Sequence, residues 1–247
     1  MNRLIFYPQP CKQPHHGRSL TWHDSAVLPL LLFAVFTLVG LSSCDTDAYE
    51  SGDTSLSYLR ADFVMAQTGL TKQVVGATND DGERLLFDKP FECEWTTTAD
   101  STYRALLYYK NRTDEAPQPI SLLPVLILEP KPLKVGETDS TDPVTWESAW
   151  LSKQQPYLNM SILIKTGVEE GLDAKQVVGI IPHGDEQQAD GTTIHHLSFF
   201  HQQNGVPEYY TSRVYVSVPT KNYRSGDIIM LTVNTYNGIV ERDFKLE

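Results

Sequence analysis

Four histidines in the second half of the chain come closest, by type and spacing, to a metal site: His183, His195, His196 and His201. Imidazole nitrogens are common zinc ligands. On an extended strand His195 and His201 would share one face, with His196 on the other. Six residues separate the first two, which corresponds to roughly 20 Å, too far to share one ion. No HExxH or Cys/His spacing accompanies them. We therefore expect ordinary strand histidines, with no metal and no cofactor.

Nucleophilic chemistry has little support in the sequence. Cys93 lies between Glu92 and Glu94, whose carboxylates would raise its thiol pKa, and residues 56–131 contain no histidine to act as a base. A buried structural cysteine is the expected role. No serine occurs in a GxSxG or SxxK arrangement. The two carboxylates of a glycoside hydrolase are recognised by their separation in space, so that activity stays open. We expect no catalytic residue and no enzyme.

Cys44 has the clearest predicted chemistry. It follows an apolar run, Ala26–Leu41, which is short of the roughly 20 apolar residues of a spanning helix and suits the core of a signal peptide. The run ends in Leu41-Ser42-Ser43-Cys44, which resembles the lipobox of bacterial lipoproteins. That resemblance implies cleavage between Ser43 and Cys44 and acylation of the Cys44 thiol, with palmitate-type chains holding the protein in a bilayer. The alternative is an uncleaved anchor helix with an incidental cysteine.

The predicted leader, residues 1–43, has consequences for the rest of the chain. Its first part is basic, as in an n-region, but it is long, which leaves open a true start downstream at a non-Met codon. Cys11 would be lost with the leader, leaving Cys93 as a lone thiol without a disulfide framework. The acidic residues 44–55 are typical of a flexible tether. We expect the cell envelope, with lipid anchoring to the outer membrane and either a periplasmic or a surface-facing position.

The charge of the chain excludes one class of partner. The formal net charge is −11 at pH 7. Such a surface repels the phosphate backbone, so we expect no nucleic-acid binding. It favours solubility and cationic partners without specifying either.

The pattern of residues 56–131 predicts a small barrel. Period-two alternation and β-branched or aromatic runs dominate, with turn residues between them. The sequence Asn79-Asp80-Asp81-Gly82 predicts a tight hairpin. About five short strands without a helical pattern fit an OB-like β-barrel. The expected strands are 57–66, 71–78, 83–87, 103–110 and 120–128.

A polar stretch with glycine and proline, residues 134–143, predicts a domain boundary. Residues 142–247 then contain about seven alternating segments, which predict an antiparallel β-sandwich of immunoglobulin-like kind. Tyr236-Asn237-Gly238 is the clearest hairpin turn. The one helical candidate is short, around Pro219–Tyr223. The predicted fold class is thus all-β, an OB-like barrel followed by a sandwich, behind a lipoprotein signal peptide.

A lipobox, an OB-like barrel and a seven-stranded sandwich together resemble the NigD-like lipoproteins of Bacteroidetes. The segments that carry the resemblance are 57–66, 104–110, 120–128, 142–144, 150, 157–159, 195–200 and 228–238. The resemblance implies a role like bacteriocin immunity and supplies no catalytic residues to transfer.

Two functions follow as expectations. The favoured one is a membrane-anchored, non-catalytic binding lipoprotein of the cell envelope, immunity-like, with a protein ligand that the sequence does not name. The alternative is a glycan-binding or carbohydrate-active accessory lipoprotein. A solvent-exposed row of two or three coplanar aromatic rings, or two carboxylates converging in a cleft, would overturn the first in favour of the alternative. A closed, aromatic-filled core with flat polar surfaces would favour the first.

Overall fold

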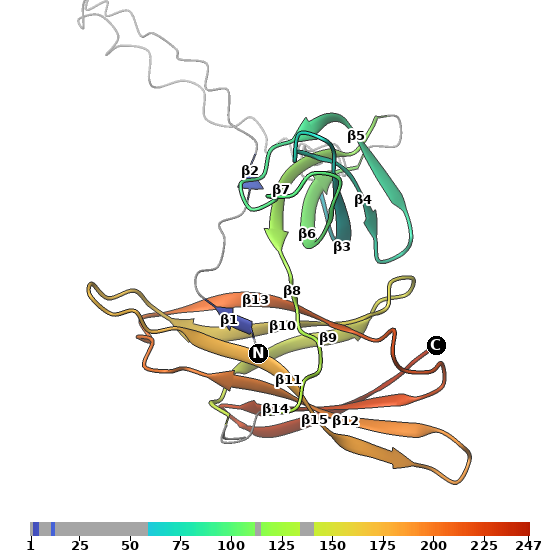
Figure 1. Ribbon diagram of the computed structural model, residues 1–247, viewed down its shortest axis with the longest axis vertical. Helices are drawn as coiled ribbons and strands as arrows, with labels where there is room; N and C mark the ends of the chain where they lie inside the picture. Colours follow the sequence, from blue (N-terminus) through green and yellow to red (C-terminus); the bar gives the residue numbers. More distant parts are fainter. Residues whose placement is uncertain (1, 5–10, 13–58, 112–114, 134–140) are drawn as a thin grey trace, which may run out of the picture.

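The structure is a computed structural model that describes residues 2–4, 11–12, 59–111, 115–133 and 141–247 (Figure 1). All regular elements in this part of the chain are β-strands, which confirms the predicted all-β class. Within the same residues we find no helix of the length and apolar character that crossing a bilayer requires. Ser43 and Cys44, the predicted cleavage and lipidation site, lie outside the described residues.

The first domain is one curled sheet of six strands. Its order is β2 (Cys11–Lys12), β7 (Gln118–Pro124), β6 (Thr102–Lys110), β3 (Leu59–Thr68), β4 (Val74–Asn79) and β5 (Arg84–Phe91). The sheet bends until β5 lies near β7, giving the half-barrel in the upper part of Figure 1. Its concave side encloses an apolar core that includes Val64, Leu85 and Leu107. The expected barrel-like domain is confirmed as a half-barrel.

The predicted hairpin at Asn79–Gly82 joins β4 and β5. The side chain of Asn79 accepts a hydrogen bond from the Glu83 backbone N–H at 2.8 Å, and its carbonyl accepts one from Gly82 at 3.0 Å. Gly82 has a φ of 84°, which a residue without Cβ adopts at little cost. The turn therefore has the chemistry that its sequence predicted, and it holds Asp80 at the end of the half-barrel.

The second domain is a sandwich of two sheets. One sheet has the order β8 (Leu126–Ile127), β13 (Tyr210–Pro219), β10 (Tyr157–Thr166) and β9 (Thr145–Leu151). The other has the order β1 (Asn2–Leu4), β11 (Gln176–Gln187), β12 (Thr193–Gln202), β14 (Ile228–Thr235) and β15 (Gly238–Lys245). Leu158, Phe199 and Leu231 are among the buried residues between the sheets. β8 belongs to the sandwich sheet although it precedes the predicted polar boundary.

Two details of the sandwich differ from the sequence predictions. The sheet is not antiparallel throughout, because β12 and β14 pair in parallel, from Ile194↔Ile228 to Phe199↔Val233. The chain leaves β12 for β13 in the other sheet and returns as β14 in the direction of β12, which requires this pairing. The helix expected at Pro219–Tyr223 is wrong: Tyr223 closes a turn on the Thr220 carbonyl at 3.0 Å. The β14–β15 hairpin at Tyr236–Gly238 is confirmed.

Strand β6 is buried on both faces, and this explains how the two domains meet. Ala105, Leu107 and Tyr109 face the core of the half-barrel. Arg104 and Leu106 point to the opposite side, because successive strand residues alternate. The outer face of the β10–β13 pair lies against that side. The second face of β6 is therefore an interface with the sandwich.

Gly76 in β4 provides a test of the half-barrel packing. A Cβ at this position would lie 2.7 Å from the backbone oxygen of Leu85 on β5. Because that oxygen belongs to the paired strand, it cannot move aside without disturbing the ladder. We expect Gly76→Ala to lower the free energy of unfolding by about 1–3 kcal/mol, the usual cost of overpacking. Urea unfolding measures it, with exposed Val75→Ala as a control expected to change by about 0.5 kcal/mol. Equal effects of the two variants would contradict the packing argument.

Candidate binding cleft between the two domains

Arg104 of β6 is the main polar contact between the half-barrel and the sandwich. Its Nη1 and Nη2 donate to the two oxygens of Asp80 at 2.6 and 2.7 Å. Nε donates to Ser217 Oγ at 3.0 Å, and Nη2 also donates to Asn159 Oδ1 at 2.9 Å. The guanidinium carbon lies 4.5 Å from the ring centroid of Tyr157. The Arg104 side chain is fully buried, so one cation holds groups of both domains.

The partners of Arg104 are bonded to one another as well. Asn159 donates to Asp80 at 2.8 Å and accepts from Ser217 at 2.7 Å. The backbone N–H of Gln154, after β9, donates to the Asp80 carbonyl at 2.9 Å. Asn159 and Ser217 face away from the apolar core of the sandwich because their neighbours in β10 and β13 fill it. The β4–β5 turn is therefore fixed to the sandwich through the backbone and side chain of Asp80.

An aromatic cluster continues this interface. Phe63 of β3 meets Trp150 of β9 at 5.1 Å between ring centroids with planes 89° apart. Tyr215 of β13 meets the same Phe63 ring at 5.6 Å and 86°. Edge-to-face contacts of this kind favour defined ring positions. Phe63 is buried, whereas Trp150 keeps 37% of its surface exposed.

A cleft of about 250 Å³ opens beside this cluster. Its lining comes from β3, from the β4–β5 turn and from the end of β9 with the following turn. The lining residues are Ala61, Asp62, Phe63, Asn79, Asp80, Asp81, Trp150, Leu151, Ser152 and Lys153. Both domains thus contribute, and domain interfaces are preferred positions for ligand sites.

The carboxylates of the cleft have different partners. Asp80 is held by Arg104, and Asp81 pairs with Lys153 at 2.8 Å. Asp62 accepts hydrogen bonds from the Tyr109 hydroxyl at 2.6 Å and from Asn79 Nδ2 at 3.5 Å. Burial, and then the bond to Asp62, raise the pKa of Tyr109, so the phenol stays protonated and donates.

These contacts bear on the carboxylate pair that a glycoside hydrolase would need. Asp62 and Asp80 do line one cleft, as the glycan alternative requires. However, both oxygens of Asp80 accept hydrogen bonds from Arg104, so this carboxylate is already engaged and is not free to act on a substrate. The arrangement is suited to binding a cation or a hydrogen-bond donor.

The histidines are dispersed rather than gathered. His195 is buried between Asp185, 2.8 Å from Nδ1, and Asp227, 3.3 Å from Nε2. The backbone N–H of Thr193 and then His195 hold the pKa of Asp227 below its usual value, against the effect of burial. His183 bonds to Ser198 at 2.7 Å. The described residues contain no group of three or more His, Cys, Asp or Glu able to hold a metal ion.

His201 is the histidine with the most unusual surroundings. It is 1% exposed, and neither ring nitrogen has a hydrogen-bond partner among the described residues. Burial lowers its pKa, while the nearby charges of Asp142 and Glu208 act in the opposite direction. His195, Leu197, Phe199 and His201 are all buried, as the strand alternation predicted for one face.

This burial predicts a stability change with pH. The unfolded chain takes up a proton near pH 6.5, whereas folded His201 resists it. His201 should therefore make the protein less stable as pH falls from about 6.5 toward its lowered folded pKa, by up to about 1.4 kcal/mol per pH unit. We expect His201→Leu to remove this part of the slope in urea unfolding between pH 7.5 and 4.5. Exposed His183→Gln is the control. An unchanged slope in His201→Leu would contradict the assignment.

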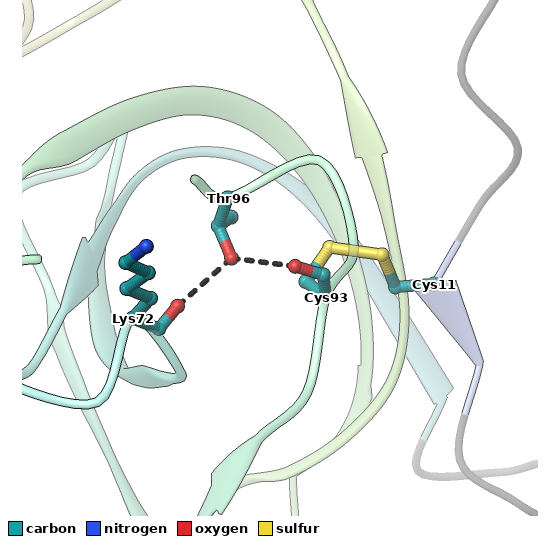
Figure 2. Close-up of a disulfide and its surroundings, with 4 residues drawn as sticks. All are labelled: Cys11, Lys72, Cys93 and Thr96. Atoms are coloured by element: carbon teal, nitrogen blue, oxygen red, sulfur yellow. Dashed lines mark hydrogen bonds between the residues drawn. A yellow bond between two sulfur atoms is a disulfide. The ribbon is translucent and has the colours of Figure 1, made fainter. Parts of the chain in front are cut away.

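In the full chain Cys93 is not a lone thiol, the state expected for it once residues 1–43 are removed. Cys93 forms a disulfide with Cys11, with 5.2 Å between their Cα atoms (Figure 2). The reason is the position of β2, whose Cys11 pairs with Leu122 of β7 and so lies beside the loop after β5. Thr96 fastens the same loop by donating to the carbonyl oxygens of Lys72 and Cys93, at 2.9 and 2.8 Å. Residue spacing alone gave no indication of this pair.

Exposed aromatic side chains gather elsewhere, at the end of β10. Tyr209, Tyr210 and Tyr236 are 66%, 56% and 48% exposed. Tyr209 donates to Glu169 at 3.1 Å, and the Lys165 ammonium lies 5.0 Å from the Tyr236 ring centroid. Tyr210 pairs with Thr166 in the ladder. The glycan alternative anticipated a row of exposed, coplanar rings; the structure gives three exposed rings at one end of β10.

The fold and the cleft together define a two-domain all-β protein with a half-barrel fastened to a β-sandwich and a small cleft between them. Residues 128–246 match the NigD-like C-terminal beta sandwich domain. The predicted resemblance to NigD-like proteins is thereby confirmed for this part of the chain. No curated protein matches the chain.

Solved structures share the fold. A NigD-like immunity protein from Bacteroides caccae is 20% identical, with a TM-score of 0.57; the match covers 76% of this chain and 97% of that one. A protein of unknown function, DUF1344, from Bacteroides vulgatus is 14% identical, with a TM-score of 0.55, covering 76% and 91%. At these identities the likeness shows a common fold.

Proposed function

We propose that the protein is a lipid-anchored, non-catalytic binding protein of the cell envelope with a bacteriocin-immunity-like role. The observation that carries the binding role is the cleft, whose walls come from both domains and are fixed by Arg104. The NigD-like sandwich, and a structure of the same fold described as a NigD-like immunity protein, support the immunity-like role. Cys44 is the proposed anchor, placing the domains at the outer membrane.

The immunity-like role is tested in the host cell. A strain lacking the gene should show larger growth-inhibition zones with culture fluid from bacteriocin-producing strains, and a plasmid copy should restore resistance. Cys44→Ser, which removes the acylated thiol, should restore resistance poorly and release the protein from the membrane fraction. Unchanged sensitivity after deletion and overexpression would contradict the proposal.

Lipidation of Cys44 affects the Cys11–Cys93 disulfide, because the cleavage that precedes it separates the two cysteines. Cleavage before Cys44 would remove residues 1–43, and with them β1, β2 and Cys11. The mature protein would then carry Cys93 as a thiol. Mass spectrometry of the membrane-bound protein, with and without reduction, tests this directly: an acylated N-terminal Cys44 is the expected result. A retained residue 1–43 peptide, joined through Cys11, would contradict it.

The glycan-binding alternative is favoured by one observation, the three exposed tyrosines at the end of β10. Exposed rings can stack on sugar faces. Electrophoresis through gels containing a polysaccharide would show retardation that Tyr209→Ala and Tyr236→Ala abolish. If wild-type mobility is the same in every polysaccharide gel tested, the alternative fails.

A further inference from the structure

Strand β3 has an open backbone edge beside the cleft. β3 pairs with β6 along residues 59–67, but with β4 only from Val64 onward. At that point β4 ends and the chain turns, with the Asp80 N–H donating to the Phe63 carbonyl at 3.0 Å. Among the described residues, no strand therefore pairs with residues 59–62 on the β4 side of β3.

The alternation along a strand shows which peptide groups stand at this edge. In an antiparallel ladder, the N–H and C=O of one residue point to one neighbouring strand, and those of the next residue point to the other. The Phe63 carbonyl points to the β4 side, because Asp80 bonds to it. The N–H and C=O of Ala61, two residues earlier, point to that side as well. Ala61 and Phe63 both line the cleft, so the unpaired groups of Ala61 border it.

One face of the open edge is apolar. Phe63 points toward the sandwich, where its ring meets that of Trp150 at 5.1 Å between centroids. Trp150 also lines the cleft and is 37% exposed. Ala61 points to the same side as Phe63, and its small side chain is exposed. A strand placed beside Ala61 would therefore set one of its side chains against the apolar surface of Phe63 and Trp150.

The other face of the edge is acidic. Asp62 points into the half-barrel, where its Oδ2 accepts hydrogen bonds from the Tyr109 hydroxyl and from Asn79 Nδ2. The same Nδ2 donates to Glu83 at 3.3 Å, so two carboxylates lie near each other. Arg60 on the same face supplies one positive charge against these two. A basic side chain facing Asp62 is therefore favoured, and the net charge of −11 also attracts cationic partners.

We propose that the cleft binds a cationic polypeptide in extended conformation, which pairs with the open edge of β3 and extends the sheet of the half-barrel. Backbone hydrogen bonds at Ala61 would supply affinity, and alternating side chains, apolar toward Trp150 and basic toward Asp62, would supply specificity. The cleft holds about 250 Å³, which suits a short stretch of chain whose ends continue into solvent. This inference rests on the proposed binding function and names the chemistry of its partner.

The test uses the full chain and a heptapeptide of alternating lysine and valine, with alternating glutamate and valine as the comparison. Calorimetry measures binding, and NMR follows amide hydrogen exchange. We expect the lysine peptide to bind about tenfold more tightly than the glutamate peptide. It should also slow exchange of the Ala61 amide about tenfold or more, because that N–H then donates to the peptide. Binding without slower exchange at Ala61 would overturn the inference.

Ala61→Pro tests the backbone edge directly. It removes the N–H on the open side and leaves the β6 ladder intact, a position that proline tolerates. Binding should weaken about tenfold or more, whereas the matched control Ala61→Ser keeps the N–H and should bind within about twofold of the wild type. Equal binding by the two variants would overturn the inference. Should Ala61→Pro unfold, a lysine peptide with every backbone amide N-methylated decides, because undiminished binding of that peptide excludes strand pairing.

Asp62→Asn tests the acidic face. It keeps an acceptor oxygen for Tyr109 and should reduce the preference for the lysine peptide about threefold or more. Asp243→Asn on β15, an exposed aspartate in the sheet on the other side of the sandwich, changes the net charge equally. It should alter the preference less than about twofold at 0.15 M salt, where distant charges are screened. Equal effects of the two variants would overturn the assignment of the basic side chain to Asp62.

The inference and the proposed function fail separately. If the wild-type protein does not bind the lysine peptide, the inference fails, whether or not the deletion strain becomes sensitive. If deletion leaves sensitivity unchanged, the immunity-like role fails, whatever the peptide titration shows.

Discussion

Replacing Arg104 with Met is expected to lower the free energy of unfolding by about 3–5 kcal/mol, the usual cost of removing one partner of a buried ion pair. The variant leaves Asp80, whose side chain is 15% exposed, without its cation, and Ser217 loses the donor on Nε. Arg104→Lys should recover only part of the loss, because an ammonium group cannot bond Asp80 with two parallel N–H groups while also reaching Ser217 and Asn159. Denaturant unfolding measures both.

The control for Arg104 is Arg213, which makes an equally short pair with Glu147. Both Nε and Nη2 donate to Glu147 at 2.6 Å, but the Arg213 side chain is 52% exposed. The bonds from Arg213, and next that from Ser161, lower the pKa of Glu147 to about 2. Because water screens an exposed pair, Arg213→Met should cost about 1 kcal/mol or less. If the two variants lose the same stability, burial is not what makes Arg104 important.

The second large effect concerns the disulfide. In the oxidised full chain, Cys93→Ser should lower the free energy of unfolding by about 2–4 kcal/mol, since the bond closes a loop of 82 residues and restricts the unfolded state. In a chain that begins at Asp45, which lacks Cys11, the same substitution should change stability by about 1 kcal/mol or less. Urea unfolding of the four proteins gives the comparison, and equal effects in the two backgrounds would contradict a stabilising role for Cys11–Cys93.

Local features of the fold could be predicted because short-range chemistry determines them. Asn79–Gly82 and Tyr236–Gly238 form the hairpins that their residue types favour. The alternation in β12 placed His195 and His201 on one shared face, and the structure shows that this face is buried. The parallel pairing of β12 with β14 could not be seen in the same way, because it depends on β13 crossing to the other sheet.

The cleft could not be predicted from the sequence either, because it also depends on contacts between residues far apart in the chain. Arg104 stands in an ordinary aromatic strand, and its bond to Ser217 joins residues 113 positions apart. Asn159 and Ser217 occupy the outer face of a sandwich sheet, where polar residues usually face water. Only the docking of the half-barrel makes them buried partners. A cation inside an otherwise apolar strand is the one sign that could have suggested an interface.

The two short N-terminal strands have a consequence for assembly. β1 covers the edge of β11 at Gln176–Val178, and β2 covers the edge of β7 at Ser121–Leu122. Processing before Cys44 would remove both strands and expose two unpaired rows of backbone N–H and C=O groups. Such rows readily accept a strand from another chain. Such processing would thus add two exposed sheet edges to those already present, and strand addition at them would depend on whether the leader is present.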